Sequence, residues 1–296
     1  MTGVLLTAGE TMAMVAPATE SPLESAESFR IDAGGAESNV AGHVAALGGR
    51  ARWFSRLGAD PLGRRIALRL ARRGIDVSGV VFDGEHRTGL YVKNPGRGVH
   101  YYRDDSAASH LGGADADGLD LSDVELIHVS GITAALSGSA PAFLDRLIAR
   151  AASAGIPVSF DVNHRAALWD AATAAPVLDT LVRRADVVFV GRDEAEALWR
   201  TPTAADVRAR FPGVAELVVK DGEVGATAFT ATGRVFVPSH RVHVVEPVGA
   251  GDAFAGGYLA ALLRGDDPTA RLTSGHERAA LTLLTTADFP DESETS

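Results

Sequence analysis

Short apolar runs rich in β-branched residues recur along the chain at wide spacing. Segments with apolar residues at helical spacing separate them, at residues 39–48, 61–74, 139–155 and 175–185. Strands that alternate with helices predict an α/β fold with a mainly parallel central sheet. The predicted strands are VLLT (4–7), VELIHVS (124–130), PVSFDV (157–162), ADVVFV (185–190) and ELVVK (216–220).

The region from residue 78 to residue 105 breaks this rhythm. Three strand-like pieces, VSGVVFD, TGLYVKN and GVHYYRD, follow one another without a helix between them, joined by the turn signals DGEH and NPGRG. We expect them to form a small antiparallel sheet with part of residues 10–36. Such a sheet serves either as a lid over a site at the carboxyl ends of the strands or as a dimer interface.

Composition narrows the classes of protein and of site. The chain has 296 residues, 46% of them hydrophobic, which suits one large domain with a small appendage. Its net charge of −10 argues against nucleic-acid and anionic-membrane partners. The absence of cysteine excludes disulfides, thiolate zinc sites and cysteine nucleophiles. No basic, apolar leader opens the chain, so we expect a soluble, cytoplasmic protein.

A glycine-rich stretch, VVEPVGAGDAFAGGYLAALL (244–263), carries the first candidate chemistry. HVVEP predicts a strand that ends at Pro247, and AFAGGYLAALL predicts a helix, so GAGD falls at the helix N-terminus. Exposed N–H groups there bind anions, and Asp252 beside them could take a proton from an attacking hydroxyl. In the alternative interpretation, Gly249 and Gly251 form a tight turn and Asp252 is a helix N-cap.

A second glycine motif lies in DAGGAESNVAGHVAALGG (32–49), where two glycines precede a helix opened by Ser38 or Asn39. Taken alone, it is equally well a plain turn between a strand and a helix. In combination, the stretch GGAESNVAGHVAALGGRARWFSRLGADPLG and the stretch VEPVGAGDAFAGGYLAALL resemble the two signatures of the ribokinase-like (phosphofructokinase-B) sugar kinases. The resemblance covers almost the whole chain. It implies one ribokinase-like domain, residues 1–296, with a three-layer α/β fold and a β-sheet lid formed from about residues 11–35 and 78–105.

The resemblance also implies a catalytic apparatus that uses ATP and Mg²⁺, and it allows a monovalent cation. Asp252 matches the family's catalytic base, and the GAGD backbone matches the anion hole that holds the transferring phosphoryl group. The stretch VVKDGEVGATAF (218–229) resembles the nucleotide segment, and as a hairpin with a DG turn it is compatible with that role. The residues implied are Gly249, Ala250, Gly251 and Asp252 for catalysis, and Lys220, Gly222 and Gly225, with Gly249 and Gly251, for the nucleotide.

Two positions depart from the family pattern. Glu246 and Pro247 stand where Asp-Thr often precedes the GAGD turn. Gly191 stands at the asparagine of the Asn-x-x-Glu segment that organises Mg²⁺ through water, while Glu194 is retained. Magnesium is therefore expected to depend on Glu194 and the nucleotide phosphates.

Two further stretches bear on the acceptor sugar. In GVHYYRDDSAASHL, strand alternation places Tyr101 and Arg103 on one face, and the strand PVSFDV delivers Asn163 and Arg165 to its carboxyl end. These stretches resemble the patterns YYRxxSAAS and DxNxRxxLW of the 2-keto-3-deoxygluconate kinases within the family, whose substrate carboxylate suits arginine. The implied substrate residues are Gly34, Gly35, Asn39, Tyr91, Tyr101, Arg103, Arg165, Asp252 and Asp288, and Asn163 and Arg165 are also expected at the nucleotide.

The resulting hypothesis is an ATP- and Mg²⁺-dependent kinase of 2-keto-3-deoxygluconate, a small acid sugar. The alternatives are a fructokinase- or ribokinase-like kinase of a neutral sugar, and a non-catalytic regulator that binds a sugar or a nucleotide. We expect no nucleic-acid or membrane partner, and we expect a homo-oligomer formed through the lid sheet.

Overall fold

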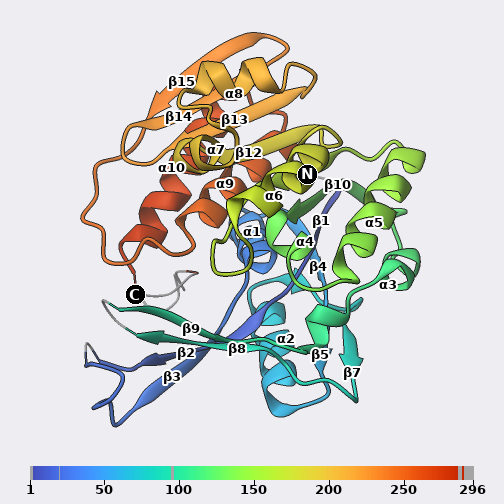
Figure 1. Cartoon of the computed structure of the whole chain (residues 1–296), viewed down its shortest axis with the longest axis vertical. Coiled ribbons are helices and arrows are strands. Elements are labelled where there is room, and N and C mark those ends of the chain that lie inside the picture. Colours follow the sequence, from blue (N-terminus) through green and yellow to red (C-terminus); the bar gives the residue numbers. More distant parts are fainter. Residues whose placement is uncertain (1–2, 20, 95–96, 286–288, 290–296) are drawn as a thin grey trace.

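A nine-stranded sheet runs through the centre of the protein in the computed structural model, which describes residues 3–19, 21–94, 97–285 and 289 (Figure 1). Neighbouring strands are parallel except at one edge, where two antiparallel hairpins add the last two strands. In order across the sheet, the strands are β15 (Gly233–Pro238), β14 (Gly225–Thr230), β13 (Glu216–Asp221), β12 (Val187–Gly191), β11 (Val158–Asp161), β10 (Val124–Ser130), β1 (Val4–Ala8), β4 (Arg50–Phe54) and β6 (Ile75–Asp76).

Helices cover both faces of this sheet and complete three layers. One face packs against α1 (Ala36–Ala46), α2 (Pro61–Arg72), α9 (Ala250–Leu263) and α10 (Pro268–Leu283). The other face packs against α3 (Gly113–Asp117), α4 (Gly131–Ala134), α5 (Ala140–Ala154), α6 (Ala171–Val182), α7 (Arg192–Trp199) and α8 (Ala204–Arg210).

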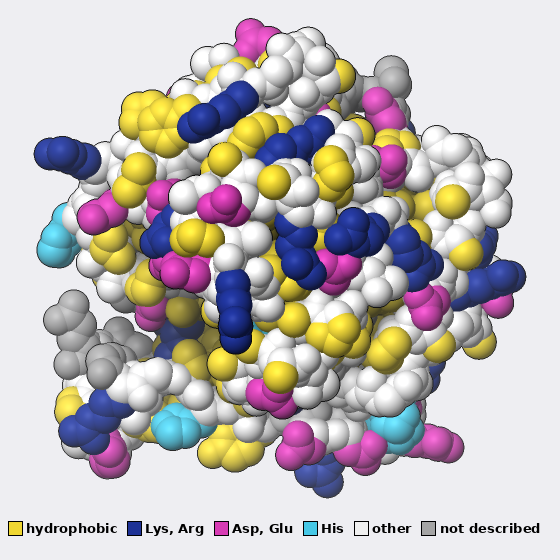
Figure 2. Space-filling model, turned by 45° about the horizontal axis from the view of Figure 1, so that its top comes forward, with side chains coloured by type: hydrophobic (Ala, Val, Ile, Leu, Met, Phe, Trp, Pro, Cys, Tyr) yellow, Lys and Arg dark blue, Asp and Glu magenta, His cyan; other side chains and the backbone are white. Residues whose placement is uncertain are grey.

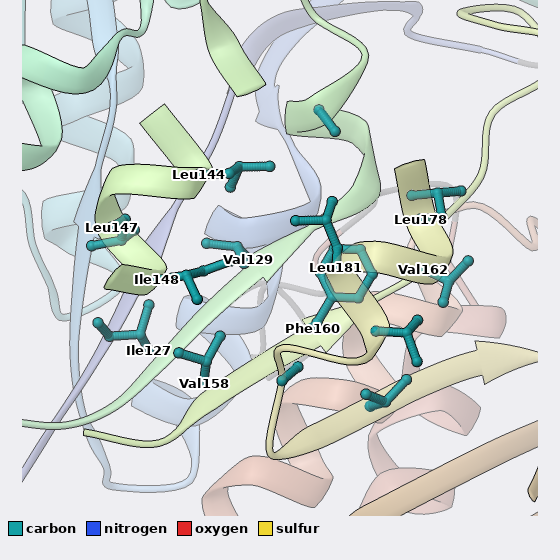
Figure 3. Packing of buried hydrophobic residues seen from close by; sticks show 14 of the residues in the cluster. Ile127, Val129, Leu144, Leu147, Ile148, Val158, Phe160, Val162, Leu178 and Leu181 are labelled. Carbon is teal, nitrogen blue, oxygen red and sulfur yellow. The ribbon is translucent and has the colours of Figure 1, made fainter. Parts of the chain in front are cut away.

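Alternation along each central strand supplies the two cores. Along β12, Val188 and Val190 join the cluster under α5 and α6, whereas Phe189 joins the cluster under α1 and α9. Figure 3 shows the first cluster, in which side chains from β10 and β11 interdigitate with side chains from α5 and α6. Burial on both faces explains why the strands read as continuous apolar runs rather than as alternating patterns. The predicted α/β fold, with all five predicted strands, is confirmed.

The predicted strand ending at Pro247 is wrong. Residues 239–248 contain no strand, and Val244 and Val245 are about half exposed. The preceding strand, β15, is the edge strand of the sheet, and this segment does not pair with it. Its backbone instead returns towards α10, where the Val245 N–H donates to the Leu283 carbonyl at 2.8 Å. A run of β-branched residues therefore does not by itself make a strand.

A second, four-stranded sheet projects from the α/β body (Figure 1). The two outer pairs are antiparallel, but β2 and β8 run parallel, so the sheet is mixed rather than purely antiparallel. Its strands are β3 (Phe29–Gly34), β2 (Met12–Pro17), β8 (Leu90–Asn94) and β9 (Gly98–Tyr102). We call it the lid sheet.

The piece VSGVVFD does not join the lid sheet as predicted. Its strand β7 (Val81–Asp83) pairs with β5 (Arg56–Gly58) in a separate two-stranded sheet. The Arg56 guanidinium donates to the Asp83 carboxylate at 2.7 Å, which ties β7 to β5. The contribution of residues 78–105 to the lid sheet is therefore confined to β8 and β9.

The surface carries charges of both signs. Lys and Arg side chains lie among Asp and Glu on the face shown in Figure 2. The lid sheet exposes large apolar side chains, among them Phe29, Ile31 and Tyr102, but assembly through this sheet stays a prediction. Within the described residues, every helix is too short or too polar to cross a bilayer.

Two glycines in α9 allow close approach of neighbouring helices. A Cβ on Gly256 would lie 2.5 Å from the His43 Cβ of α1, and a Cβ on Gly257 would lie 2.4 Å from the Ser274 carbonyl oxygen of α10. Both glycines therefore face neighbouring helices. These glycines hold α1, α9 and α10 together, and α1 and α9 carry much of the candidate site.

We predict that Gly257→Ala destabilises the fold, because the Ser274 backbone would have to move. Overpacking of this kind costs roughly 1–3 kcal/mol, which exceeds the gain of about 1 kcal/mol from the helix propensity of alanine. Urea unfolding measures the change. Gly213→Ala is the control, since its Cβ would meet no atom within 4 Å. An unfolding midpoint for Gly257→Ala at or above that of the control would contradict the packing argument.

Candidate active site

Asp252 lies in the first turn of α9 and is the centre of the candidate site. Gly249 precedes the helix with φ 86°, a left-handed conformation that glycine adopts without strain, and Ala250 is the first helical residue. The Asp252 carboxylate is buried and accepts hydrogen bonds from side-chain amides: Asn39 Nδ2 at 2.9 Å and Asn163 Nδ2 at 3.4 Å. The N-cap is Gly249, so the interpretation of Asp252 as a helix cap is wrong.

The two asparagines lie far apart in the chain. Asn39 lies in α1, directly after the glycine motif in which Gly34 ends β3, and Gly35 has no room for a side chain because a Cβ would lie 2.3 Å from the Glu10 carbonyl oxygen. Asn163 follows β11 in a left-handed conformation with φ 41°, which asparagine tolerates better than most residues. This backbone conformation directs its amide towards Asp252. The predicted residues Asn39, Asn163 and Asp252 therefore meet.

Burial controls the charge of Asp252. Desolvation raises the pKa of its carboxyl from 3.8 to about 6, although the Asn39 hydrogen bond and the Arg165 cation oppose the rise. The nearby Asp161 carboxylate raises the pKa further. A carboxyl with a pKa of about 6 is mostly ionised at neutral pH yet basic enough to accept a proton, which is the state that a general base requires.

A second buried carboxyl, that of Glu37, lies close enough to act electrostatically on Asp252. Its Oε1 accepts hydrogen bonds from Ser130 Oγ at 2.6 Å and from Thr133 Oγ1 at 3.2 Å. Gly9 leaves room for it, since a Cβ there would lie 2.2 Å from the Glu37 carboxyl carbon. Burial and the charge of Asp252 raise the pKa of Glu37 from 4.5 to about 7, against the pull of its hydrogen bonds. Sequence analysis missed this residue, because a glutamate in a first helical turn usually faces solvent.

Asp161 and Lys220 form an ion pair beside the GAGD turn. Asp161 ends β11, and its Oδ2 accepts from Lys220 Nζ of β13 at 2.8 Å. The same ammonium lies 3.5 Å from the position that a Gly251 Cβ would occupy, so it borders the helix N-terminus. The other oxygen of Asp161 is buried without a hydrogen-bond partner among the described residues. Sequence analysis named Lys220 but not Asp161, although the FDVN motif placed this aspartate at a strand end.

Glu194 joins two loops at the same edge of the sheet. Its Oε2 accepts from the Gly191 N–H at 3.0 Å, which caps α7, and its Oε1 accepts from the His164 N–H. Burial and the Asp161 charge raise the pKa of the Glu194 carboxyl. Gly191, which replaces the family asparagine, still supplies its backbone N–H to this arrangement. A direct metal-ligand role for Glu194 stays a prediction.

The predicted substrate side chains gather at the edge of the lid sheet. The rings of Tyr91 and Tyr101 lie 5.9 Å apart, and the Arg103 guanidinium carbon lies 5.7 Å from the centre of the Tyr101 ring. Arg103 also pairs with Glu10, which is buried and accepts from Ser106 Oγ at 2.7 Å. Strand alternation correctly placed Tyr101 and Arg103 together, whereas Glu10 was not anticipated because its carboxylate comes from the distant turn after β1.

Arg165 occupies an exposed turn rather than a helix start. Helix α6 begins only at Ala171, so Arg165 does not lie at the N-terminus of that helix. Its guanidinium has no carboxylate partner among the described residues, yet its charge lowers the pKa of Asp252. Arg165 is thus an available cation close to the candidate base.

The remaining predicted residues divide into three groups. Gly222 lies in the β13–β14 hairpin turn. Gly225 has φ 146°, and a Cβ there would lie 2.4 Å from the Val237 carbonyl oxygen, so both the backbone and the space require glycine. The hairpin is confirmed; its contact with a nucleotide stays a prediction. Glu246 accepts from the Val248 N–H at 3.3 Å and steadies the turn before GAGD. Asp288 lies outside the described residues.

The whole chain matches a known protein family. The model of the pfkB family of carbohydrate kinases matches residues 4–291. The chain belongs to the pfkB family. It is 36% identical over 287 residues to a 2-dehydro-3-deoxygluconokinase of Thermoproteus tenax, covering 94% of this chain and 87% of that protein. It is 33% identical to a 2-dehydro-3-deoxygalactonokinase of Haloferax volcanii, covering 99% and 96%. A crystal structure of a Thermotoga maritima 2-dehydro-3-deoxygluconokinase superposes with a TM-score of 0.90 at 26% identity, covering 98% and 95%.

Membership of the pfkB family makes this protein a carbohydrate kinase and confirms the ribokinase-like fold. The site geometry agrees with that chemistry. A buried, partly basic carboxylate lies in the same helical turn as a set of backbone N–H groups, so a hydroxyl and a phosphoryl group can meet there. The intact contacts from Asn39 and Asn163 to Asp252 argue against a non-catalytic regulator.

We predict that Glu37→Gln changes how stability depends on pH. A pKa raised from 4.5 to about 7 means that the folded state binds this proton more tightly than the unfolded state. In wild type, the free energy of unfolding should therefore fall as pH rises from 4.5 towards 7, because the buried Glu37 carboxyl holds a proton that the unfolded state releases. The glutamine variant has no such proton at this position. Urea unfolding from about pH 5 to about pH 8 measures the difference between the two proteins. Parallel curves for wild type and Glu37→Gln would contradict it; Glu125→Gln, at an exposed glutamate of β10, is the control.

Proposed function

We propose that this carbohydrate kinase transfers the γ-phosphoryl group of ATP to a hydroxyl of 2-keto-3-deoxygluconate (2-dehydro-3-deoxygluconate). The observation that carries the proposal is Arg165, an exposed cation without a carboxylate partner in the described part of the chain, which acts electrostatically on the candidate base. A substrate with its own carboxylate would pair with this guanidinium. The names of the Thermoproteus tenax and Thermotoga maritima relatives support the same acid sugar.

The proposed mechanism uses groups that the fold brings together. Arg165 binds the sugar carboxylate, and Tyr91 and Tyr101 border the sugar beside the lid sheet. The Asp252 carboxylate, held by the amides of Asn39 and Asn163, accepts the proton of the attacking hydroxyl. Backbone N–H groups at the start of α9 then hold the charge of the phosphoryl group in flight, and no covalent enzyme intermediate is needed.

Lys220 and the lid sheet complete the transfer. The Lys220 ammonium borders the GAGD turn and adds positive charge where the phosphates would lie. Movement of the lid sheet towards the body would exclude water, which would otherwise compete with the sugar hydroxyl. Both contributions raise the rate by electrostatics and positioning.

The residues near Lys220 fit a magnesium ion. Asp161 has a buried carboxylate oxygen without a hydrogen-bond partner among the described residues. Glu194 lies close enough for the Asp161 charge to raise the pKa of its carboxyl. Mg²⁺ prefers oxygen ligands and retains water, so one or two such carboxylates with the ATP phosphates suffice. When bound, the ion would neutralise phosphate charge. A monovalent cation stays a prediction.

One contact favours a neutral-sugar kinase instead. Arg103 already pairs with the buried Glu10, so its guanidinium offers hydrogen bonds without net charge. If Arg103 stays paired when the sugar binds, the acid sugar depends on Arg165 alone. The advantage in kcat/KM of an acid sugar over fructose or ribose would then be smaller than expected.

We predict that a panel of 2-keto-3-deoxygluconate, fructose and ribose gives the highest kcat/KM for the acid sugar in an ADP-release assay. Arg165→Ala should raise KM for the acid sugar by at least ~10-fold and leave KM for ATP nearly unchanged, because one charge-assisted pair is worth about 1.5–3 kcal/mol. Arg72→Ala, at an exposed arginine of α2, is the control. A higher kcat/KM for a neutral sugar, or equal KM changes for both substrates, would reject the acid-sugar assignment.

We predict that Asp252→Asn lowers kcat by at least ~10²-fold while the protein stays folded, because the amide cannot accept the proton. In wild type, kcat/KM should fall as pH drops through about 6, where Asp252 becomes protonated. Steady-state kinetics and urea unfolding separate this role from a structural one. The comparison is Asp267→Ala, which removes a true N-cap and should cost about 1 kcal/mol of stability without a large loss of kcat. The base assignment fails if Asp252→Asn behaves like Asp267→Ala.

A further inference from the structure

Two histidines and an aspartate meet at the root of the lid sheet, outside the candidate active site. His86, Asp105 and His110 each offer a ligand atom, and these atoms all lie within 4.8 Å of one another. The imidazole rings of His86 and His110 stack with their centres 3.5 Å apart, and His110 Nε2 lies 2.7 Å from Asp105 Oδ1. In the described part of the chain, no other group of three histidines and acids comes this close.

The fold brings these residues together through the hairpin of the lid sheet. Leu90 at the start of β8 pairs with Tyr102 at the end of β9, so the segments before β8 and after β9 leave the sheet side by side. A parallel bridge between Arg87 and Ser106 joins these two segments, and the Ala107 N–H donates to the Arg87 carbonyl at 2.8 Å. His86 and Asp105 are thereby set opposite each other by backbone contacts, independently of any attraction between their side chains.

The neighbouring short helix and turn supply the third residue. His110 ends the 3₁₀ helix η1 (Ala107–His110), whose N-cap Ser106 accepts from the Ser109 N–H. Asp105 has φ 55°, a left-handed conformation in the turn where the Ser106 N–H donates to the Arg103 carbonyl. This turn directs the chain back into η1, so Asp105 and His110 lie close enough to contact.

A buried acceptor orients one of the imidazoles. Asp83 Oδ2 lies 3.1 Å from His86 Nδ1. Asp83 also accepts from the Arg56 guanidinium and from the N–H groups of Glu85 and His86, so it is an ionised acceptor. His86 Nδ1 must then carry the hydrogen, which leaves Nε2 with a free lone pair. A histidine that binds a metal through one ring nitrogen usually donates the N–H of the other to a carboxylate, which fixes the orientation of the ring.

We propose that His86, Asp105 and His110 bind one divalent transition-metal ion of the Zn²⁺ type at the root of the lid sheet. Two imidazoles and a carboxylate with water in the open position match the donor preference of Zn²⁺, and they suit Mg²⁺ poorly. Zinc bonds of about 2.0–2.2 Å require ligand atoms roughly 3.3 Å apart. The Asp105 and His110 side chains are exposed, so they have room to rotate towards that spacing.

The site is linked to Arg103, one of the predicted sugar contacts. Asp105 lies in the turn that begins at Arg103, and Ser106 of that turn donates to Glu10, the partner of Arg103. An ion bound to Asp105 and His110 would hold this turn, and with it the position of the Arg103 guanidinium. The ion would act on sugar binding and not on the base.

Calorimetric titration of the untagged protein with Zn²⁺, in the presence of saturating Mg²⁺, tests the site. We expect one Zn²⁺ per chain. Its affinity should fall at least ~10-fold in His86→Ala, His110→Ala and Asp105→Asn, because loss of a group that merely orients a ligand already costs about 10-fold and loss of the ligand itself costs no less. His100→Ala, at an exposed histidine of β9, should bind as wild type. Binding in wild type should also raise the melting temperature, and the three variants should lose that rise. Absence of stoichiometric binding, or equal affinity in wild type and His110→Ala, overturns the proposal.

A kinetic arm tests the connection to Arg103 and rests on the proposed function. With Zn²⁺ at the stoichiometric point, KM for the acid sugar should fall in wild type and stay constant in His110→Ala, with kcat unchanged in both. An unchanged KM in wild type would overturn the connection, while calorimetry decides the metal site independently of which sugar the enzyme uses. Failure of the substrate assignment therefore cannot be mistaken for failure of the site.

Discussion

The hydrogen bonds from Asn39 and Asn163 to Asp252 are the interactions on which the candidate site depends. They join residues 213 and 89 positions apart in the chain, so α1, β11 and α9 must all be in place before the base has its partners. The carboxylate they hold is buried, which makes its charge expensive and its proton affinity high. Without the amides the site would favour the protonated, inactive form. With these two hydrogen bonds, the carboxylate can be shielded from water and still be ionised at neutral pH.

Several structural features follow from bringing α1 and α9 this close. The glycines of α9 let the helix pack against α1 and α10, and Gly35 lets the start of α1 approach the turn after β1. The same compactness buries Glu37 behind Asp252, where Ser130 and Thr133 satisfy one of its oxygens. Two carboxyls in one dry region cannot both ionise at little cost. The pKa of each is raised, and Asp252, with two amides and a nearby arginine, has the lower value.

Charge is arranged differently on the two sides of Asp252. Towards β13, two carboxyls, those of Asp161 and Glu194, lie with the single Lys220 ammonium. At the lid sheet, Glu10 pairs with Arg103, whereas Arg165, which has no carboxylate partner among the described residues, acts on the Asp252 carboxyl. The proposed acid sugar and nucleotide would therefore not have to share one cation. On this acidic protein, anions would be bound by local cations rather than by the net charge.

The sequence by itself determined the alternation of strands and helices and the two glycine motifs, because each depends on residues close together in the chain. The resemblance of one of these motifs to a family signature pointed to Asp252 as the candidate base. Local pattern failed where long-range pairing was decisive. The valines before Pro247 return towards α10 instead of pairing with the edge strand β15, and the strand at residues 81–83 pairs with β5 instead of the lid sheet. Only the tertiary structure decided that Glu37, Asp161 and Glu10 face the site, and that His86 meets Asp105 and His110. A charged side chain looks the same in sequence whether it faces water or another buried charge, and long-range packing makes that choice.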